Sequence, residues 1–514
     1  MVFASPIFLL LFLPLVLAAY AIVPMRGRNP VLLIASVLFY MWGEGWFVGL
    51  VLASVVINWG FGIAIGGASE PLARRRWLTV AVAVNLLTLA VFKYANFAAA
   101  NLDELARAVG RAPVSWASIP LPLGISFFTF HAISYVVDVY KRNARAERRL
   151  FDFALYILLF PQLIAGPIIR WRDFTDQIAR RDWRAADVAY GIRRFLLGLG
   201  KKVLIANTLG RVADAVFELP RAQLTTPLAW LGLVCYTLQI YFDFSGYSDM
   251  ALGLMRMFGF RILENFNYPY ISRSIREFWR RWHISLSNWF LDYLYVPLGG
   301  NRHGTARAYR NLVIVFLLCG LWHGASWPFV LWGIWHGLFL VVERAGVGRV
   351  LERLGPVSHV YALAVVMGGW VLFRSSTLAR AEIFYTALLG FGTGDPVQRP
   401  LREFLDPLVA TTLVFAVAGA TPIARHLGDW LEQLASTRPR ASAVVLTADT
   451  AWLVLVLITA TAFLAAGTYN PFIYFRFRHG PWTLCGCPPC LLRPPRRTRG
   501  AIGRSSRSWP SCCR

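Results

Sequence analysis

The feature that most constrains this chain is the run Leu312–Val342, which contains no Asp, Glu, Lys or Arg. Such a run is typical of segments inside a lipid bilayer, where ~20 apolar residues span the hydrocarbon core. It includes two histidines, His323 and His336. Because an ionisable side chain is expensive to desolvate in a membrane, both are candidate functional residues. If a helix begins near Leu312, His323 lies ~16 Å along it, about half of a ~30 Å core.

The composition is that of a polytopic membrane protein. Of the 514 residues, 57% are hydrophobic and 15% are charged, whereas soluble domains are usually ~45–50% apolar and ~25% charged. The net charge of +25 comes from short basic blocks between apolar runs. This pattern is typical of cytoplasmic loops that face anionic lipid. It indicates membrane lipid as a partner and argues against nucleic acid.

Apolar runs and basic loops alternate in a way that predicts several membrane crossings. Val31–Ile65 is long enough for two spans, joined outside the cytoplasm by the turn Trp42–Trp46 with its acid Glu44. The basic loops Arg74–Arg76 and Lys141–Arg149 then both face the cytoplasm. With the remaining runs, about eleven to thirteen segments are expected. Those runs are Val2–Val23, Leu78–Phe92, Leu121–Tyr140, Ile192–Val216, Leu228–Tyr241, Tyr361–Phe373, Leu408–Thr421 and Ala451–Ala466.

The run Phe151–Ile169 does not fit simple alternation, because basic loops flank it on both sides. Pro161 and Gly166-Pro167 also interrupt it. A re-entrant hairpin explains both facts, since irregular backbone is tolerated at membrane depth when protein buries it. The alternative is an ordinary span followed by an arginine-rich outer loop. The sequence leaves both interpretations open.

A helix over Ile275–Tyr293 would carry two stripes at helical spacing. The polar stripe could hold an anionic phosphate or pantetheine donor, or it could contact lipid phosphates. The apolar stripe consists of Ile275, Trp279, Trp282, Leu286, Trp289 and Tyr293, and the polar stripe of Arg276, Arg280, His283 and Ser287. We therefore expect an interfacial helix, with Arg276 and Arg280 as candidate donor-binding residues.

His323 is the strongest candidate for chemistry. Gly320 and Gly324 permit close backbone approach around it, and Ser326-Trp-Pro328 suits the start of a new helix. A neutral imidazole can act as a general base on a hydroxyl. The alternative is a hydrogen-bonded core histidine. His336 is the weaker candidate, as a substrate-contacting residue.

Two carboxylates, Asp243 and Asp249, follow the apolar run that ends near Tyr241. They could orient a histidine or bind a polar substrate, or they could be helix-end residues that pair with nearby arginines. The sequence contains no nucleotide-binding loop, no Gly-x-Ser-x-Gly elbow and no metal-ligand pair at helical spacing. These patterns leave histidine-assisted group transfer inside a membrane, with no bound metal or cofactor. A transporter or flippase with proton-relay histidines is the alternative from another class, although no paired broken repeats are visible.

Several long motifs resemble the membrane-bound O-acyltransferase family, and within it the bacterial branch for alginate O-acetylation. They are Arg276-Glu-Phe-Trp-Arg-Arg-Trp-His283, Asp292-Tyr-Leu-Tyr-Val-Pro-Leu-Gly-Gly-Asn-Arg302, Leu321-Trp-His323-Gly-Ala, Gln239–Met250 and Gly369-Trp-Val-Leu-Phe-Arg374. The resemblance implies an all-α bundle with re-entrant and interfacial helices around a central funnel. It implies acyl transfer to a hydroxyl, with His323 catalytic and His283 also in the reaction chamber.

The same resemblance implies a cytoplasmic donor, acetyl-CoA, and a polysaccharide acceptor beyond the bacterial inner membrane. Partner proteins there would be a periplasmic acetyltransferase or polysaccharide-modifying proteins. Other acceptors within the class are peptidoglycan, cellulose and teichoic acid, the last receiving D-alanine. The resemblance covers a domain from residue 1 to about Phe477. Arg478–Arg514 departs from it, with eight arginines, no acids and clustered cysteines, and is expected to be a disordered tail.

Overall fold

The computed structural model describes residues 2–470, apart from residues 114, 115, 396, 398, 438 and 468. Over these residues the chain is helical and contains no β-strand, so the all-α fold class is confirmed. The expected tail Arg478–Arg514 lies outside the described residues. The proposed domain boundary at Phe477 therefore stays a prediction.

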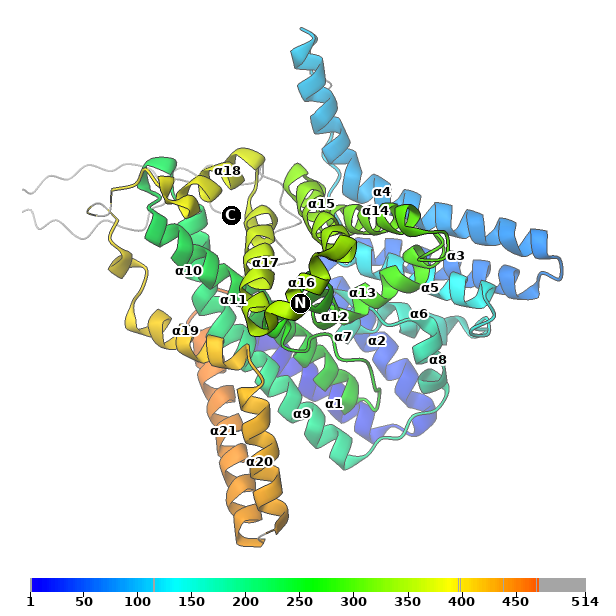
Figure 1. Ribbon diagram of the computed structural model, residues 1–514. Helices are drawn as coiled ribbons and strands as arrows, with labels where there is room; N and C mark the ends of the chain where they lie inside the picture. Colours follow the sequence, from blue (N-terminus) through cyan, green and yellow to red (C-terminus); the bar gives the residue numbers. More distant parts are fainter. Residues whose placement is uncertain are drawn as a thin grey trace, which may run out of the picture. The chain divides into compact units, whose positions relative to one another are not determined.

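The first half of the chain supplies ten α-helices and two π-helical segments (Figure 1). These are η1 (Phe8–Phe12), α1 (Leu13–Ile22), α2 (Met25–Glu44), α3 (Phe47–Gly67), α4 (Pro71–Ala108), α5 (Ile125–Tyr140), α6 (Leu150–Leu158), α7 (Phe160–Leu163), α8 (Trp171–Ala179), α9 (Ala185–Gly200), η2 (Lys201–Ala206) and α10 (Asn207–Phe217). Because η2 joins α9 directly to α10, these three form one long rod.

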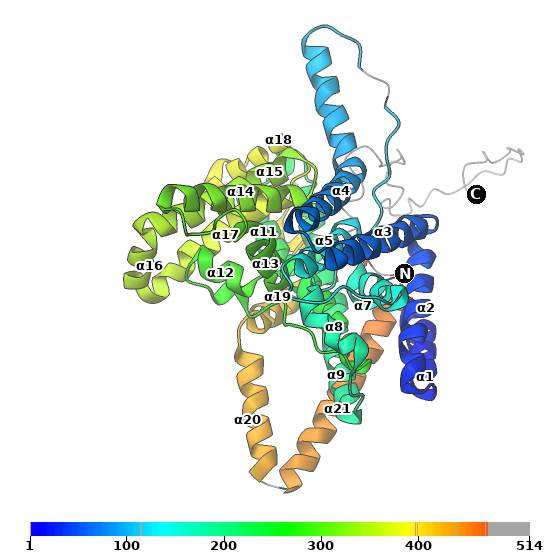
Figure 2. The same cartoon turned by 90° about the vertical axis from the view of Figure 1, so that its right-hand side faces the viewer.

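The second half begins with the longest buried helix, α11 (Thr226–Met257). It is followed by α12 (Ile275–Arg281), α13 (Ile284–Phe290), η5 (Leu291–Tyr295), α14 (Thr305–His323), α15 (Trp327–Val342), η6 (Glu343–Val347), α16 (Gly348–Leu354), α17 (Ser358–Arg374), α18 (Leu378–Thr386), η8 (Ala387–Phe391), α19 (Pro407–Gly419), α20 (Ile423–Thr437) and α21 (Pro439–Ala465). Figures 1 and 2 both show α20 and α21 as a two-helix hairpin. Short 3-10 turns connect the remaining elements.

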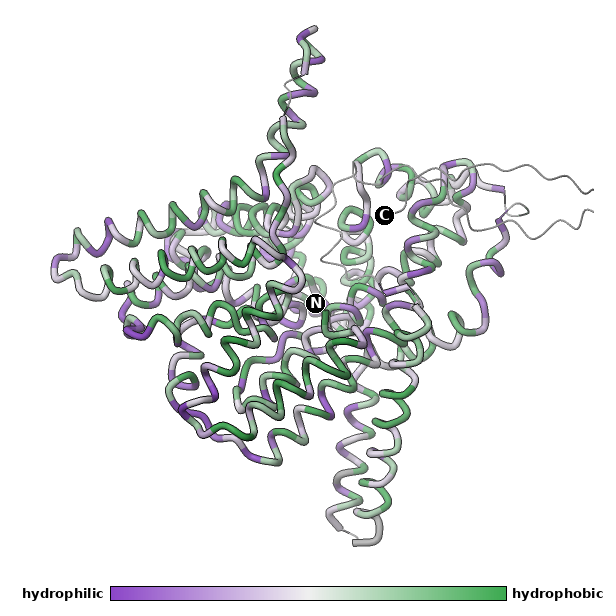
Figure 3. The backbone as a smooth tube through the Cα atoms, turned by 180° about the vertical axis from the view of Figure 1, so that it is seen from behind, coloured by the Kyte–Doolittle hydropathy of each residue, from purple (hydrophilic) through white to green (hydrophobic). Residues whose placement is uncertain are grey.

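The described residues contain four helical stretches that are long and apolar enough to cross a membrane. They are Phe47–Gly67, Pro71–Ala108, Trp327–Arg374 and Ser442–Ala465, and a fifth is added if α19 and α20, bent by 69°, form one span. Figure 3 shows hydrophobic residues along most of the helical tube and hydrophilic ones gathered at several turns. The chain is a multi-pass membrane protein.

The four or five full-length spans are fewer than the eleven to thirteen expected segments. Some of those segments are short, such as α5 with 16 residues. Others are covered by protein, as α11 is along most of its length. A helix surrounded by other helices can carry aromatic and charged side chains that a lipid-facing helix cannot.

Two local expectations can be compared directly with the structure. The turn between α2 and α3 falls at Gly45, whose φ of 53° requires the left-handed freedom of glycine. Glu44 beside it is buried, and its carboxylate accepts a hydrogen bond from the backbone N–H of Leu123 at 3.0 Å. The predicted span Leu78–Phe92 is too short, because α4 continues unbroken to Ala108.

The run Phe151–Ile169 has the features of a re-entrant segment. Helix α6 has nine residues, which is ~14 Å of rise against a ~30 Å core. Leu159 then breaks the helix, α7 adds a single turn, and Ile168 and Ile169 continue outside any helix. Since this irregular backbone is buried throughout, the re-entrant interpretation fits the structure better than an ordinary span.

Candidate active site

His323 lies at the tip of a tight helical hairpin. Helix α14 ends at His323 and α15 begins at Trp327, as the Ser326-Trp-Pro328 pattern predicts. The two helices pack backbone against backbone, because a Cβ added at Gly320 would lie 2.3 Å from the carbonyl oxygen of Phe329. A Cβ at Gly333 would lie 2.3 Å from the carbonyl oxygen of Phe316. This contact fixes the end of α14 and therefore the position of His323.

Aromatic rings enclose the His323 imidazole. The ring centroids of Trp322, Trp332 and Phe373 lie 4.9, 5.0 and 5.2 Å from it, each roughly perpendicular to it. His323 is 7% exposed, and its Nδ1 has no hydrogen-bond partner among the described residues. Buried polar atoms of proteins are normally paired. A buried imidazole nitrogen without a partner is therefore unusual, and it marks His323 as a candidate for chemistry.

His283 reaches the same region by a route that the helical pattern did not predict. The expected single helix over Ile275–Tyr293 is wrong, because the chain breaks between α12 and α13 and His283 adopts φ 46°. Tertiary hydrogen bonds replace the helical ones at the break: Ile284 N–H donates to Asn265 O at 3.0 Å. A non-glycine residue in this conformation is strained, and such strain concentrates at functional sites.

The break removes His283 from the predicted basic stripe and buries it completely. Its ring lies 4.6 Å from that of Phe244 and 6.1 Å from that of Trp322. Neither ring nitrogen of His283 has a hydrogen-bond partner within the described part of the chain. Trp322 thus contacts both His283 and His323, which places the two predicted histidines in one chamber.

His336 is a third buried imidazole beside this chamber. Its Nδ1 accepts a hydrogen bond from Trp279 Nε1 at 3.4 Å. Its ring lies 5.0 Å from Trp332, which in turn contacts His323. His336 and His323 therefore both pack against the indole ring of Trp332.

Two cavities of very different size follow each other along α14. A large cavity of about 1050 Å³ is lined by Phe316 and Cys319 of α14, together with α12, α13 and η6. A small cavity of about 50 Å³ is lined by Trp322 and His323. Cys319 and His323 are one helical turn apart, a rise of ~6 Å. His323 thus lines the small cavity one helical turn from the part of α14 that lines the large one.

The large cavity is basic on one wall. The arginines that line it are Arg273, Arg276, Arg280 and Arg344, and the acids that line it are Glu277, Glu343 and Glu352. Arg276 and Arg280 form no salt bridge with any described residue, whereas the nearby acid Glu277 is paired with Arg281 at 2.9 Å. Positive charge on a concave wall attracts anions such as phosphate. The predicted donor-binding pair therefore faces a cavity of suitable size.

Glu343 also lines the large cavity and holds α12 in place. Its carboxylate accepts hydrogen bonds from the backbone N–H groups of Ile275 at 2.6 Å and Arg276 at 3.1 Å. An acidic group at a helix N-terminus satisfies donors that the helix leaves free. Glu343 thereby fixes the helix that carries Arg276 and Arg280.

Asp243 and Asp249 lie elsewhere than predicted. They sit inside α11, not at a helix end, because that helix continues to Met257. Asp243 pairs with Lys202 at 2.8 Å, and Asp249 pairs with Arg194 and Lys201, each at 2.6 Å. These contacts join α9 and η2 to α11. Of the predicted alternatives, pairing with neighbouring basic residues fits both carboxylates.

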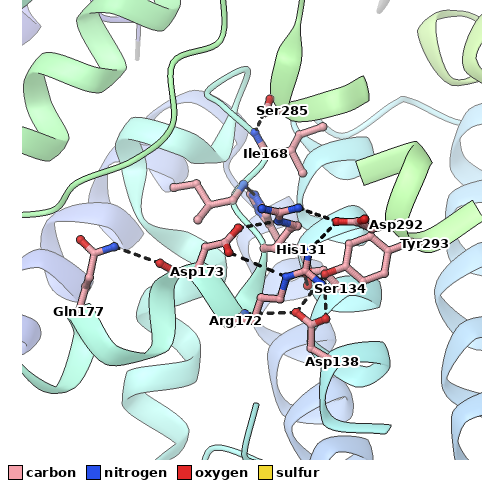
Figure 4. A network of polar contacts seen from close by, with 12 residues as sticks. His131, Ser134, Asp138, Ile168, Arg172, Asp173, Gln177, Ser285, Asp292 and Tyr293 are labelled. Carbon is pink, nitrogen blue, oxygen red and sulfur yellow. Dashed lines mark hydrogen bonds and ion pairs between the residues drawn. The ribbon is translucent and has the colours of Figure 1, made fainter. Parts of the chain in front are cut away.

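A polar network that sequence patterns did not reveal anchors α13 (Figure 4). The backbone N–H of Ile168 donates to Ser285 Oγ at 3.0 Å, and the N–H of Ile169 donates to Nε2 of the buried His131 at 3.3 Å. Asp292 accepts from Arg170 and Arg172, each at 2.5 Å. Because Ser285 follows His283 by two residues, the network ties the re-entrant segment to the chamber that contains His283 and His323.

Lys93 and Tyr94 of α4 are further residues that the sequence analysis missed. Lys93 Nζ donates to the carbonyl oxygen of Trp322 and to Ser126 Oγ, the latter at 3.0 Å. Tyr94 OH donates to the carbonyl oxygen of Leu321 at 2.8 Å. The predicted span ended at Phe92 and so excluded both. A lysine directly after an apolar run is the signal that could have identified them.

The described residues contain no group of three or more His, Cys, Asp or Glu side chains that could hold a metal ion. The chemistry available in the chamber is that of imidazoles beside a basic cavity. An imidazole can take a proton from a hydroxyl, and arginines can hold an anionic donor.

Known proteins are similar in sequence to this chain over most of its length. The family model of the membrane-bound O-acyltransferases matches residues 117–350. The probable alginate O-acetylase AlgI of Azotobacter vinelandii is 44% identical over 501 residues, covering 93% of this chain and all of the relative. The protein of the same name from Pseudomonas aeruginosa is 47% identical over 418 residues, 81% of this chain and 80% of that one. The peptidoglycan O-acetyltransferase of Helicobacter pylori is 31% identical over 460 residues, 82% and 86% of the two chains.

Proposed function

Because this chain belongs to the membrane-bound O-acyltransferase family, we propose that it passes acetyl groups across the bacterial inner membrane for O-acetylation of alginate. The alginate assignment rests on relatives at 44% and 47% identity whose names state that activity. The observation that carries the mechanism is that His323 lines the small cavity, one helical turn from Cys319 in the lining of the large, arginine-containing cavity. Such a position lets a donor and an acceptor meet at one imidazole.

The large cavity is the proposed donor site. Acetyl-CoA carries several phosphates, and the guanidinium groups of Arg276 and Arg280, which form no salt bridge with a described residue, suit them. A cavity of about 1050 Å³ can hold an extended pantetheine arm with its nucleotide toward the rim. The apolar floor at Phe316 and Cys319 then leads the thioester toward His323.

The small cavity is the proposed acceptor side. Leu123 lines it and donates to the carboxylate of Glu44, so this cavity lies at the same end of the protein as the Trp42–Trp46 turn. Counting basic loops puts that turn outside the cytoplasm. The acetyl group thus leaves toward the periplasm, where polysaccharide or a periplasmic partner protein takes it up.

The chemical step is a proton-coupled acyl transfer. His323 removes the proton of the acceptor hydroxyl while the hydroxyl oxygen bonds to the acetyl carbonyl carbon. The carbon–sulfur bond of the thioester then breaks, and the proton passes from the imidazolium to the leaving thiolate. General-base assistance of this kind contributes roughly 10²–10⁴-fold. His283, whose ring also neighbours Trp322, positions the reacting groups.

Deleting the gene and measuring acetyl esters on exported alginate and on peptidoglycan tests the proposal. We expect alginate acetylation to disappear and to return with the wild-type protein but not with His323→Ala, while peptidoglycan is unchanged. Unchanged alginate acetylation would contradict the proposal. If acetyl groups were lost from peptidoglycan alone, the chain would instead have the peptidoglycan O-acetyltransferase activity that the name of the Helicobacter relative states.

A further inference from the structure

The C-terminal end of α14 is held by a different helix. The hydroxyl of Tyr94 and the ammonium of Lys93, neighbours on α4, donate to the carbonyl oxygens of Leu321 and Trp322. These are the two residues directly before His323. The last four carbonyls of an α-helix have no partner within the helix itself. The α4 pair thus satisfies two of the acceptors at the end that carries His323.

This contact is unusual because Lys93 belongs to a helix that suits a membrane span. An ionisable residue in such a helix is costly and usually has a defined partner. Lys93 forms no salt bridge with a described residue, and its contacts are the Trp322 carbonyl, Ser126 Oγ and the Trp322 ring face at 5.6 Å. A cation at a helix C-terminus is favoured by the helix dipole. Of these contacts, two are with Trp322 at the end of α14 and the third is with Ser126 of α5.

Lys93 also lines the small cavity together with His323. A shift at the end of α14 would move both the imidazole and the cavity wall. Displacing a catalytic group by about 1 Å can lower a rate about a hundredfold, because reaction requires near-attack geometry. A donor that fixes the last carbonyls of α14 therefore affects the rate through the position of His323.

We propose that Lys93, with Tyr94, is a positioning residue that orients His323 by clamping the C-terminal carbonyls of α14. The inference rests on the proposed role of His323 and names the residues that hold His323 in place. Loss of the α4 clamp should lower kcat and leave the KM for acetyl-CoA unchanged, because the clamp lies away from the arginines of the donor cavity. Removing the clamp lowers the fraction of molecules in which His323 is correctly placed.

The test is acetyl transfer by purified full-length variants, with kcat and the KM for acetyl-CoA measured separately. We expect Lys93→Met, which keeps the length but loses the charge and donors, to lower kcat about 10- to 100-fold with KM within about twofold. Lys93→Arg keeps a cationic donor and should recover most of that loss. Tyr94→Phe removes one hydroxyl and should lower kcat roughly two- to tenfold.

Thr88→Val is the matched control, because its hydroxyl bonds only within α4, to Val84 O at 2.9 Å; its kcat should stay at the wild-type value. Wild-type kcat in Lys93→Met, or equal losses in Lys93→Met and Lys93→Arg, would overturn the inference. If Lys93→Met does not fold, the test is made with Tyr94→Phe. An unchanged kcat in Tyr94→Phe would then overturn the inference. Failure of the wild-type protein to transfer acetyl, or wild-type activity in His323→Ala, would instead refute the proposed function.

Discussion

Substituting Gly320 tests whether the packed hairpin of α14 and α15 sets the position of His323. In Gly320→Ala the new Cβ would lie 2.3 Å from the carbonyl oxygen of Phe329, where ordinary contacts begin near 3.4 Å. The obstacle is backbone, so no side-chain rotation relieves it. The helices must separate by about 1 Å, which we expect to cost about 1–3 kcal/mol of stability. The same shift should lower kcat about a hundredfold.

The measurement is acetyl transfer together with thermal unfolding of the purified protein. Gly60→Ala is the matched control, because that glycine is also helical and a Cβ there meets nothing within 4 Å. It should leave both kcat and the unfolding temperature close to the wild type. Wild-type kcat and stability in Gly320→Ala would show that the hairpin contact does not constrain His323.

Three further outcomes follow from the structure. Arg276→Gln should raise the KM for acetyl-CoA about tenfold with protein abundance unchanged, whereas the exposed Arg75→Gln should not; equal KM values would make the basic wall a lipid contact. Asp243→Ala leaves a buried lysine without its carboxylate, so it should destabilise the fold by about 3–5 kcal/mol, and a change confined to KM would contradict this. Truncation after Phe477 should leave transfer intact, because Arg478–Arg514 lacks a hydrophobic pattern; an inactive but normally inserted truncation would disprove it.

Much of the helical framework follows from the sequence, because local signals determine it. The turn at Gly45 and the start of α15 at Trp327 both occur where glycine and the Ser-Trp-Pro pattern predict them. Small residues at Gly320 likewise predict the close hairpin. In each case the residue type limits the backbone, whatever packs against it.

The site could be predicted only in part, because its remaining features depend on distant segments. The break at His283 occurs within an uninterrupted helical pattern and is stabilised by Asn265, a contact that periodicity does not reveal. The clamp from Lys93 joins two residues that are 229 positions apart in sequence. Asp243 appeared to end a helix because its charge interrupts an apolar run, yet Lys202 compensates that charge inside the protein.

The most direct test of the account is acetyl transfer by purified His323→Ala, measured beside acetyl-CoA binding and thermal unfolding. We predict that transfer is lost, while donor binding and the unfolding temperature stay close to those of the wild type. His283→Ala, by contrast, should retain reduced transfer, because that residue positions the reacting groups. Transfer by His323→Ala at the wild-type rate would contradict the central claim that this imidazole is the general base.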